Sequence, residues 1–220
     1  MRMAYADLRL KLDFKSGEIK ILQIENPAFA IELLDDLLHQ INGEDGKVIF
    51  ENENQLVNLS KEAELIINPF ELDFSAHKIQ MRLFKEAKEI GDDYCVEQMA
   101  EVRSKVVSCL SELEKHLPYP ISYNDEFDLS VLLKMLSFSI DDEGEVFPDK
   151  LITYVKLLQR LCGIELFVFV NLLQFLSDAQ IDNLQNELRL LDVYSLFLEV
   201  KVNHLAKNAC VVDNDLCVIE

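Results

Sequence analysis

Two strongly apolar runs near the end of the chain, IELFVFV and VYSLFLEV, constrain the fold most strongly. Strands that are apolar on both faces are typical of parallel sheets covered on either side by helices. Between the runs, Ser177 and Gln180 have the spacing of a capping box, which predicts that the helix DAQIDNLQNELRLL begins there. Because strand–helix–strand connections are right-handed crossovers, the two strands should lie parallel in one sheet.

The start of the chain adds shorter elements of the same kind. The alternation in DLRLKLDF predicts a half-buried strand, and IKILQI is predicted to return as its hairpin partner after the turn KSGE. Asn26 and Pro27 suit the N-cap and first position of a helix that ends at Gly43. KVIFE, ELIIN, CVVDN and LCVIE are predicted as further short strands. The predicted fold class is therefore α/β, with a mixed sheet and a crossover βαβ unit near the C-terminus.

The middle of the chain changes to a helical pattern. Residues 75–116 contain no proline and a single glycine, and charged and apolar residues recur at helical spacing. We predict two helices that meet near Gly91 and stop before Pro118 and Pro120, followed by a third over residues 128–138. The predicted organisation is a discontinuous α/β head domain, residues 1–74 with 146–220, interrupted by an inserted helical leg domain, residues 75–145.

Composition narrows the class of protein. No window approaches 18 uninterrupted apolar residues and the N-terminus lacks the apolar core of a signal peptide, so we expect a soluble, cytoplasmic protein. Five cysteines without a C-x-x-C pair disfavour a disulfide framework or zinc knuckle. A net charge of −19 lowers the expectation of a nucleic-acid partner. Because charge is screened over about 8 Å at physiological salt, a local basic surface can still hold phosphates.

One stretch, HKIQMRLFKEAKEIG at residues 77–91, gathers basic residues in this acidic chain. Four of them recur at helical spacing, so that three or four share one side of a helix: Lys78, Arg82, Lys85 and Lys88. The apolar residues between them can point inward: Ile79, Leu83, Phe84 and Ala87. Such a face can bind phosphates, but it can equally be a solvated face paired with Glu86 and Glu89.

Two acidic clusters, YNDEFD at residues 123–128 and DDEGE at 141–145, offer oxygen ligands for a hard cation such as Ca²⁺. Alternate carboxylates of the first cluster, aided by one from the second, give the candidate ligands: Asp125, Glu126, Asp128, and Asp141 or Asp142. Neither cluster matches the twelve-residue calcium loop. Solvated acidic turns or helix N-caps are the alternative.

Motifs for catalysis are missing from the sequence. The only Gly-Lys pair, Gly46-Lys47, is followed by Val48 and is not preceded by the glycine that a phosphate-binding loop needs. There is no G-x-G-x-x-G, H-E-x-x-H or G-x-S-x-G. We therefore predict a non-enzymatic protein. The alternatives are a metal-dependent nuclease that uses the acidic clusters, and an acidic scaffold that binds other proteins.

One segment of the chain is similar in sequence to a known family. It comprises residues 164–201, IELFVFVNLLQFLSDAQIDNLQNELRLLDVYSLFLEVK. A buried strand ending Val-Asn, a loop with Phe-Leu-Ser, a helix with Leu-Gln and a strand ending Phe-Leu-Glu follow one another. The segment resembles the small accessory adaptation proteins of type II-A CRISPR–Cas systems. Outside it, the likeness is one of length, acidity, hairpin start and helical insertion.

The resemblance implies a function. Members of that family form a homotetrameric ring, bind double-stranded DNA ends without sequence preference, and hold Ca²⁺ on acidic residues of the helical region. No catalytic activity is attributed to them, and they act beside the integrase pair and the effector nuclease in spacer acquisition. For this chain, we expect DNA to contact Lys78, Arg82, Lys85 and Lys88, with Arg103, Lys105 and Lys134 as alternatives. We expect calcium at Asp125, Glu126, Asp128 and Asp141.

Overall fold

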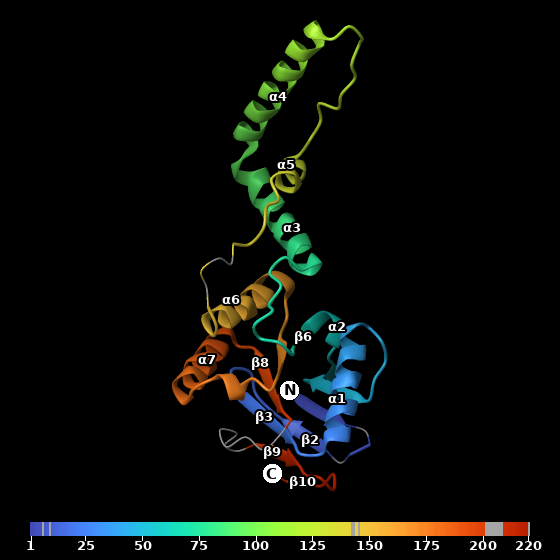
Figure 1. The fold of residues 1–220 in the computed structure, drawn as a ribbon, viewed down its shortest axis with the longest axis vertical. Coiled ribbons are helices and arrows are strands. Elements are labelled where there is room, and N and C mark those ends of the chain that lie inside the picture. Colours follow the sequence, from blue (N-terminus) through green and yellow to red (C-terminus); the bar gives the residue numbers. More distant parts are fainter. Residues whose placement is uncertain (6, 9, 142–143, 145, 201–208, 220) are drawn as a thin grey trace. The chain divides into compact units, whose positions relative to one another are not determined.

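The computed structural model describes residues 1–5, 7–8, 10–141, 144, 146–200 and 209–219. The chain forms two compact units (Figure 1). Unit 1 comprises Met1–Leu72 and Glu143–Glu220, and unit 2 comprises Asp73–Asp142. Unit 1 contains both sheets and unit 2 is helical, so the predicted α/β class is confirmed.

A six-stranded sheet in the order β10-β9-β3-β8-β7-β6 forms the centre of unit 1. Its strands are β3 (Ile19–Ile24), β6 (Ala63–Ile66), β7 (Leu166–Val170), β8 (Tyr194–Glu199), β9 (Cys210–Val212) and β10 (Val218–Ile219). All neighbours are parallel except β9 and β10. Helix α7 (Asp178–Leu191) connects the parallel, buried strands β7 and β8, which confirms the predicted crossover. The capping box at Ser177 and Gln180 is also present.

A second, antiparallel sheet has the order β2-β1-β4-β5. Its strands are β1 (Arg2–Tyr5), β2 (Leu10–Asp13), β4 (Val48–Asn52) and β5 (Gln55–Leu56). The predicted hairpin of β2 with IKILQI is wrong, because β2 pairs with β1 and β3 lies between β8 and β9. Gly17 accounts for the change of sheet. It has a left-handed φ of 70° and donates its N–H to the carbonyl of Val193 at 2.8 Å, next to β8.

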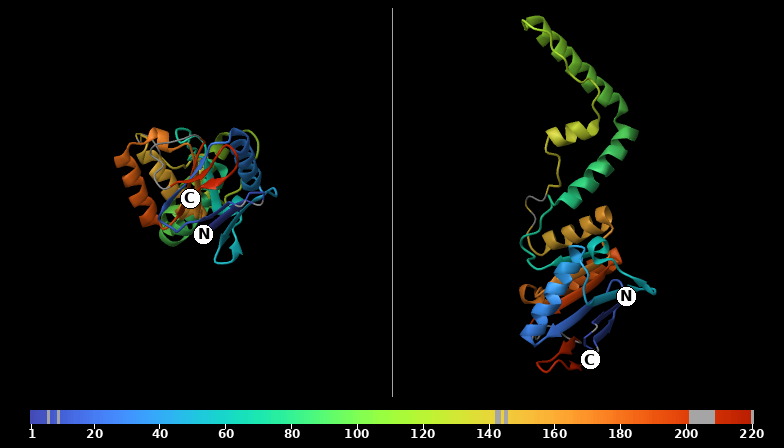
Figure 2. Two further views of the ribbon diagram at one scale, coloured as in Figure 1. Left: turned by 90° about the horizontal axis from the view of Figure 1, so that it is seen from below. Right: turned by 90° about the vertical axis from the view of Figure 1, so that its right-hand side faces the viewer.

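Helices cover both faces of the six-stranded sheet (Figure 2). On one face lies α1 (Pro27–Ile41), which begins at Asn26 as predicted. Its inner residues Phe29, Leu33 and Leu37 join a core formed by both sheets. On the other face lie α7 and α6 (Asp149–Leu157), and α6 continues through a π turn (Leu158–Cys162) to Gly163. Two short pieces, α2 (Leu59–Glu62) and the 3₁₀ turn Leu173–Phe175, complete unit 1.

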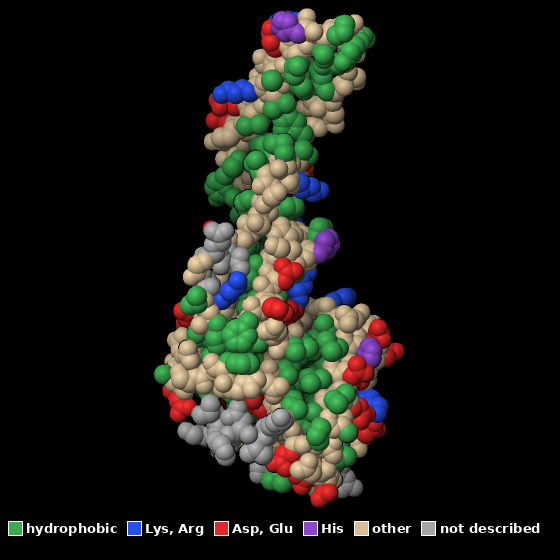
Figure 3. Space-filling model, viewed as in Figure 1, with side chains coloured by type: hydrophobic (Ala, Val, Ile, Leu, Met, Phe, Trp, Pro, Cys, Tyr) green, Lys and Arg blue, Asp and Glu red, His purple; other side chains and the backbone are tan. Residues whose placement is uncertain are grey.

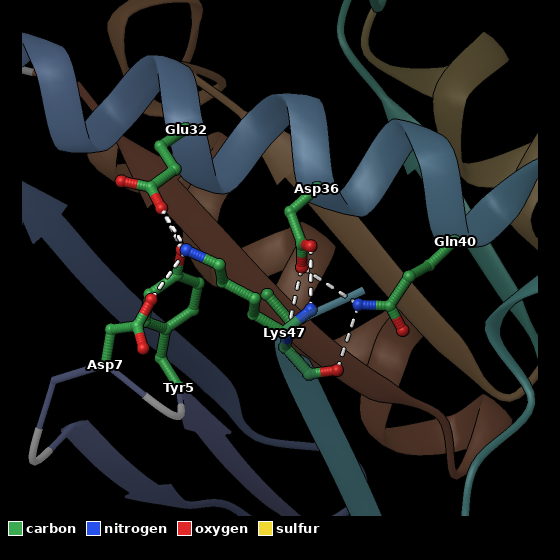
Figure 4. Close-up of polar contacts among 7 residues, drawn as sticks. Tyr5, Asp7, Glu32, Asp36, Gln40 and Lys47 are labelled. Atoms are coloured by element: carbon green, nitrogen blue, oxygen red, sulfur yellow. Dashed lines mark hydrogen bonds and ion pairs between the residues drawn. The ribbon is translucent and has the colours of Figure 1, made fainter. Parts of the chain in front are cut away.

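The loop between α1 and β4 is held by a side chain of α1 (Figure 4). The Asp36 carboxylate accepts the backbone N–H groups of Lys47 at 2.7 Å and Val48 at 2.8 Å. Gln40 donates to Asp36 and to the carbonyl of Val48, both at 2.9 Å. The two backbone donors where this loop enters β4 therefore have partners within the chain.

The Lys47 ammonium belongs to the same network. It donates to Asp7 at 2.6 Å and to Glu32 at 2.8 Å, and these two hydrogen bonds raise the pKa of Lys47. Glu32 also accepts the Tyr5 hydroxyl at 2.8 Å. Burial, together with this bond to Glu32, raises the pKa of Tyr5 to about 12. The two ion pairs and the tyrosine hydrogen bond thus join β1, the following turn and α1 to Lys47, the residue before β4.

Unit 2 consists of α3 (His77–Tyr94), α4 (Val96–His116) and α5 (Leu129–Met135). The first two helices meet at Cys95, four residues after Gly91, near which the junction was predicted. Gly91 stays within α3 and is buried there, because the Leu129 side chain of α5 occupies the space that a Cβ would need. After α4 ends at His116, before Pro118 as predicted, residues 117–128 run back beside α4 (Figures 1 and 2).

Leu33→Ala should destabilise unit 1, since Leu33 is 0% exposed in the core and such a truncation costs about 2–5 kcal/mol. Ile31→Ala on the same helix is the matched control, because Ile31 is 69% exposed and surface changes usually stay within about 0.5 kcal/mol. The chain has no Trp, so urea unfolding is followed by circular dichroism. Equal losses in the two variants would contradict the described packing of α1.

Tyr5→Phe should make stability less sensitive to alkali. The folded-state pKa of Tyr5 is raised from 10.0 to about 12, so its contribution is complete below pH 10 and is lost as pH rises towards 12. This lost contribution is roughly 2–3 kcal/mol. Urea midpoints measured from pH 8 to pH 11.5 should therefore fall more steeply for the parent than for Tyr5→Phe. The exposed Tyr119→Phe serves as control and should follow the parent.

Candidate nucleic-acid interface

The first half of α3 carries positive charge without any carboxylate. From His77 to Lys85 the helix contains Lys78, Arg82 and Lys85 and no Asp or Glu. All three basic side chains are exposed. The apolar residues between them are buried or half-buried, as predicted: Ile79, Leu83, Phe84 and Ala87. The helix is therefore two-sided, with cations on its outer face.

The N-terminus of α3 adds to this positive potential. Ala76 precedes the helix without a side-chain cap, and no acidic residue lies in the first turn. The exposed N–H groups of a helix start carry a partial positive charge, which favours anions nearby. Lys78 lies in that first turn. The helix dipole and the basic side chains thus favour the same kind of ligand.

Two of the predicted DNA contacts have little competition from carboxylates. Arg82 has no ion pair or hydrogen bond to another side chain within the part of the chain that the structure describes. The Lys85 ammonium lies 3.8 Å from the Glu89 carboxylate, and both side chains are about two-thirds exposed. Exposed pairs of this kind contribute little and are screened by salt. Both residues can therefore exchange solvent for phosphate.

Lys88, the fourth predicted contact, is placed differently. Its ammonium donates to the Asp128 carboxylate at 2.9 Å. This hydrogen bond is the largest influence on both groups, raising the pKa of Lys88 and lowering the pKa of Asp128. One predicted DNA contact and one predicted calcium ligand are thus partners of each other.

The alternative basic residues also divide into two groups. Arg103 donates to the carbonyl of Phe127 at 2.8 Å, and its guanidinium lies 5.8 Å from the centre of the Phe127 ring. Lys105 and Lys134 are exposed, and neither has an ion pair to a described residue. Arg103 therefore has a structural partner, while the two lysines face solvent.

The predicted calcium ligands do not form a cation site within the described residues of one chain. Asp125 and Glu126 are exposed in the segment beside α4, and Asp128 is paired with Lys88. Asp141 is exposed, and Asp142 lies outside the described residues. No three His, Cys, Asp or Glu side chains among the described residues converge as metal ligands do. The single chain, as described, does not fit a calcium cage.

Where a phosphate-binding loop would lie in unit 1, other groups of the chain already bind the backbone donors and the lysine. At the start of α1, the Asn26 side chain accepts the N–H groups of Ala28 and Phe29, each at 3.0 Å, and Pro27 has no N–H. Lys47 is engaged with two carboxylates. The geometry therefore favours a scaffold that binds no phosphate at the start of α1 or at Lys47.

One feature of α4, an apolar stripe along the helix, was not predicted from the sequence. This helix of 21 residues has no buried residue among those described. Five residues spaced alternately by three and four positions form one stripe: Met99, Val102, Val106, Cys109 and Leu113. Val106 is 39% and Leu113 is 49% exposed. Figure 3 shows hydrophobic side chains gathered over α4 and the segment beside it. The 3–4 spacing was a usable signal, because it is typical of helices that pair with other helices.

The fold and this surface define a class: an acidic α/β protein with an inserted helical unit that presents a short basic helix face. Comparison with known families gives a match. The family described as CRISPR-associated protein (Cas_Csn2) matches residues 40–216, which is more than half of the chain. The chain therefore belongs to the Cas_Csn2 family of CRISPR-associated proteins.

Other comparisons add little. No curated protein matches the sequence. Among solved structures, the ATP-binding cassette of an ABC transporter in its ADP conformation is 14% identical, with 99% of this chain and 88% of that chain covered and a TM-score of 0.45. A putative ABC transporter ATP-binding protein from Pyrococcus furiosus is 10% identical, with 94% and 95% covered and a TM-score of 0.37. At these TM-scores the likeness carries no argument. No helix in the described part of the chain is long and apolar enough to cross a membrane.

Proposed function

We propose that this CRISPR-associated protein binds the ends of double-stranded DNA without sequence preference, as a homotetrameric ring, during spacer acquisition. In this proposal it has no catalytic activity and works beside the integrase pair and the effector nuclease. The supporting observation is the first half of α3, where Lys78, Arg82 and Lys85 are exposed and no carboxylate intervenes. In a chain of net charge −19, such a face is unusual.

The kind of contact follows from the side chains. Exposed lysine and arginine side chains neutralise phosphates, which carry no base sequence, so binding should not depend on the DNA sequence. The surrounding carboxylates repel a duplex that approaches elsewhere on the surface. A preference for ends follows if the basic faces of several copies surround a hole that the duplex has to thread.

Self-association is supported by the α4 stripe. An apolar stripe of this length on a helix without buried residues leaves contact area for another chain. The 3–4 spacing suits a second helix, and a second copy of the same chain offers one. We therefore propose that α4 takes part in the contacts that build the tetramer.

Calcium is retained in the proposal on the family resemblance alone. Because the described residues of one chain do not converge on a cation, no role is assigned to calcium in the DNA contact itself. In this proposal the calcium ligands come from more than one copy of the chain.

Replacing Lys78, Arg82 and Lys85 together by Ala should strongly weaken duplex binding. Each lost phosphate contact should also lower the slope of log affinity against log salt concentration by about one unit, hence by roughly three units in all. The measurement is fluorescence anisotropy of a labelled linear duplex over a series of salt concentrations, repeated with two unrelated sequences. Intact DNA after incubation with Mg²⁺ is expected for every variant.

A charge-matched control removes three exposed lysines of unit 1, Lys11, Lys15 and Lys61, and so produces the same change in net charge. This control should keep the parental salt slope. Equal weakening in both triple variants would mean that only net charge matters, and the α3 face would lose its assignment. Cleavage of DNA that disappears with one carboxylate substitution would overturn the non-enzymatic proposal.

Val106→Glu should reduce the assembled mass, because it places a charge in the centre of the α4 stripe. Ser108→Glu, an exposed position on the opposite side of the same helix, is the matched control and should assemble like the parent. Size-exclusion chromatography with light scattering, in calcium and in a chelator, measures both effects. A tetramer formed by Val106→Glu would show that the α4 stripe is not part of the contact between copies. A parental mass that is the same in calcium and in chelator would remove calcium from the proposal.

A further inference from the structure

Three consecutive residues of unit 2 are held at the point where α3 and α4 meet. Asp128 is bound by Lys88 of α3 at 2.9 Å, and the carbonyl of Phe127 is bound by Arg103 of α4 at 2.8 Å. Leu129 lies against Gly91, where a side chain on the glycine would collide with it. Lys88 and Gly91 lie before the junction and Arg103 lies after it. Residues 127–129 therefore bridge the two helices.

The junction itself is a weak point. Cys95 has φ −117° and ψ 16°, so the helical geometry is interrupted between α3 and α4. Backbone hydrogen bonds continue across it, from Cys95 to Gly91 at 2.8 Å and from Met99 to Cys95 at 2.9 Å. Side-chain contacts on both sides are what can fix the angle between the helices. Asp128 is also the N-cap position of α5, so the bridge is continuous with a third helix.

We infer that Lys88, Arg103 and Gly91 are positioning residues that clasp residues 127–129 across the α3–α4 junction. In this clasp Lys88 is not a phosphate contact and Asp128 is not a calcium ligand, because the two side chains are bound to each other. The clasp fixes the direction of the basic half of α3 relative to the apolar stripe of α4. The part of this inference that concerns DNA rests on the proposed function, and the clasp itself does not.

The geometry favours a clasp over a phosphate contact for Lys88. Its side chain is 45% exposed and that of Asp128 is 47% exposed, against 66% for Lys85, which has only a distant partner. The pKa of Lys88 is raised mainly by Asp128, with a further contribution from the charge of Asp92. An ammonium that is paired with one carboxylate and is influenced by the charge of a second is an unfavourable place for a phosphate, which would add a third negative charge.

Two readouts test the inference. Hydrogen exchange of residues 127–131, measured without DNA, should become several-fold faster in Lys88→Asp and in Asp128→Lys. It should return towards the parental rate in the double variant, where the charges are exchanged. In duplex binding, Lys88→Ala should keep the parental salt slope, while Lys85→Ala should lower it by about one unit.

Each outcome has a defined meaning. Exchange that stays fast in the double variant, or does not change in the single variants, would overturn the clasp. A salt slope that falls equally in Lys88→Ala and Lys85→Ala would return Lys88 to the DNA-binding set and also overturn the inference. If neither lysine changes the slope but the charge exchange restores protection, the clasp stands and the proposed DNA-binding face fails.

Gly91→Val provides a second, uncharged test. The added side chain should displace Leu129 and speed exchange at residues 127–131. Leu129→Ala in the same chain makes room and should slow exchange again relative to Gly91→Val alone. Gly144→Val, with nothing near its Cβ direction but a left-handed φ of 86°, controls for a general backbone effect and should leave residues 127–131 unchanged. Identical exchange in parent and Gly91→Val would contradict the bridging contact.

Discussion

Electrostatic repulsion is the constraint on which the functional account depends. The chain has 40 acidic and 21 basic residues, so a polyanion is repelled by most of its surface. Salt at physiological concentration screens the influence of each charge over about 8–10 Å. The local composition of the surface therefore decides where a phosphate can approach. The first half of α3 combines exposed cations, an uncapped helix start and no carboxylate. Further along the same helix, Glu86, Glu89, Asp92 and Asp93 restore the negative character.

The basic residues of unit 2 fall into two groups, those that make contacts within the unit and those that are exposed to solvent. Lys88 and Arg103 hold the chain that returns beside α4, whereas Arg82, Lys105 and Lys134 face solvent. An exposed face that binds phosphates is useful only if its direction is fixed, and the contacts around Gly91 and Cys95 can supply that rigidity. The α4 stripe completes this division, since it leaves apolar area that one chain does not cover. Membership of the Cas_Csn2 family gives the biological setting, namely CRISPR-associated function.

Much of the fold could be predicted because its signals are local. The N-cap at Asn26, the capping box at Ser177 and the apolar strands β7 and β8 each depend on a few neighbouring residues. The partner of β2 could not be predicted so easily, because strand pairing is decided by which surfaces meet in the folded core. Short β1 was missed, and the turn at Gly17 leads to the other sheet. For the same reason, no pattern showed that Lys88 and Asp128, 40 positions apart, would pair.

Binding to DNA with and without ends tests the central claim most directly. A relaxed, covalently closed circular duplex and the same circle cut once by a restriction enzyme have the same sequence and the same phosphates. The account predicts that only the cut form competes with a labelled linear duplex, because a ring of basic faces has to be threaded. Equal competition by the closed circle would contradict end binding and would reduce the α3 face to a surface that holds duplex DNA from the side.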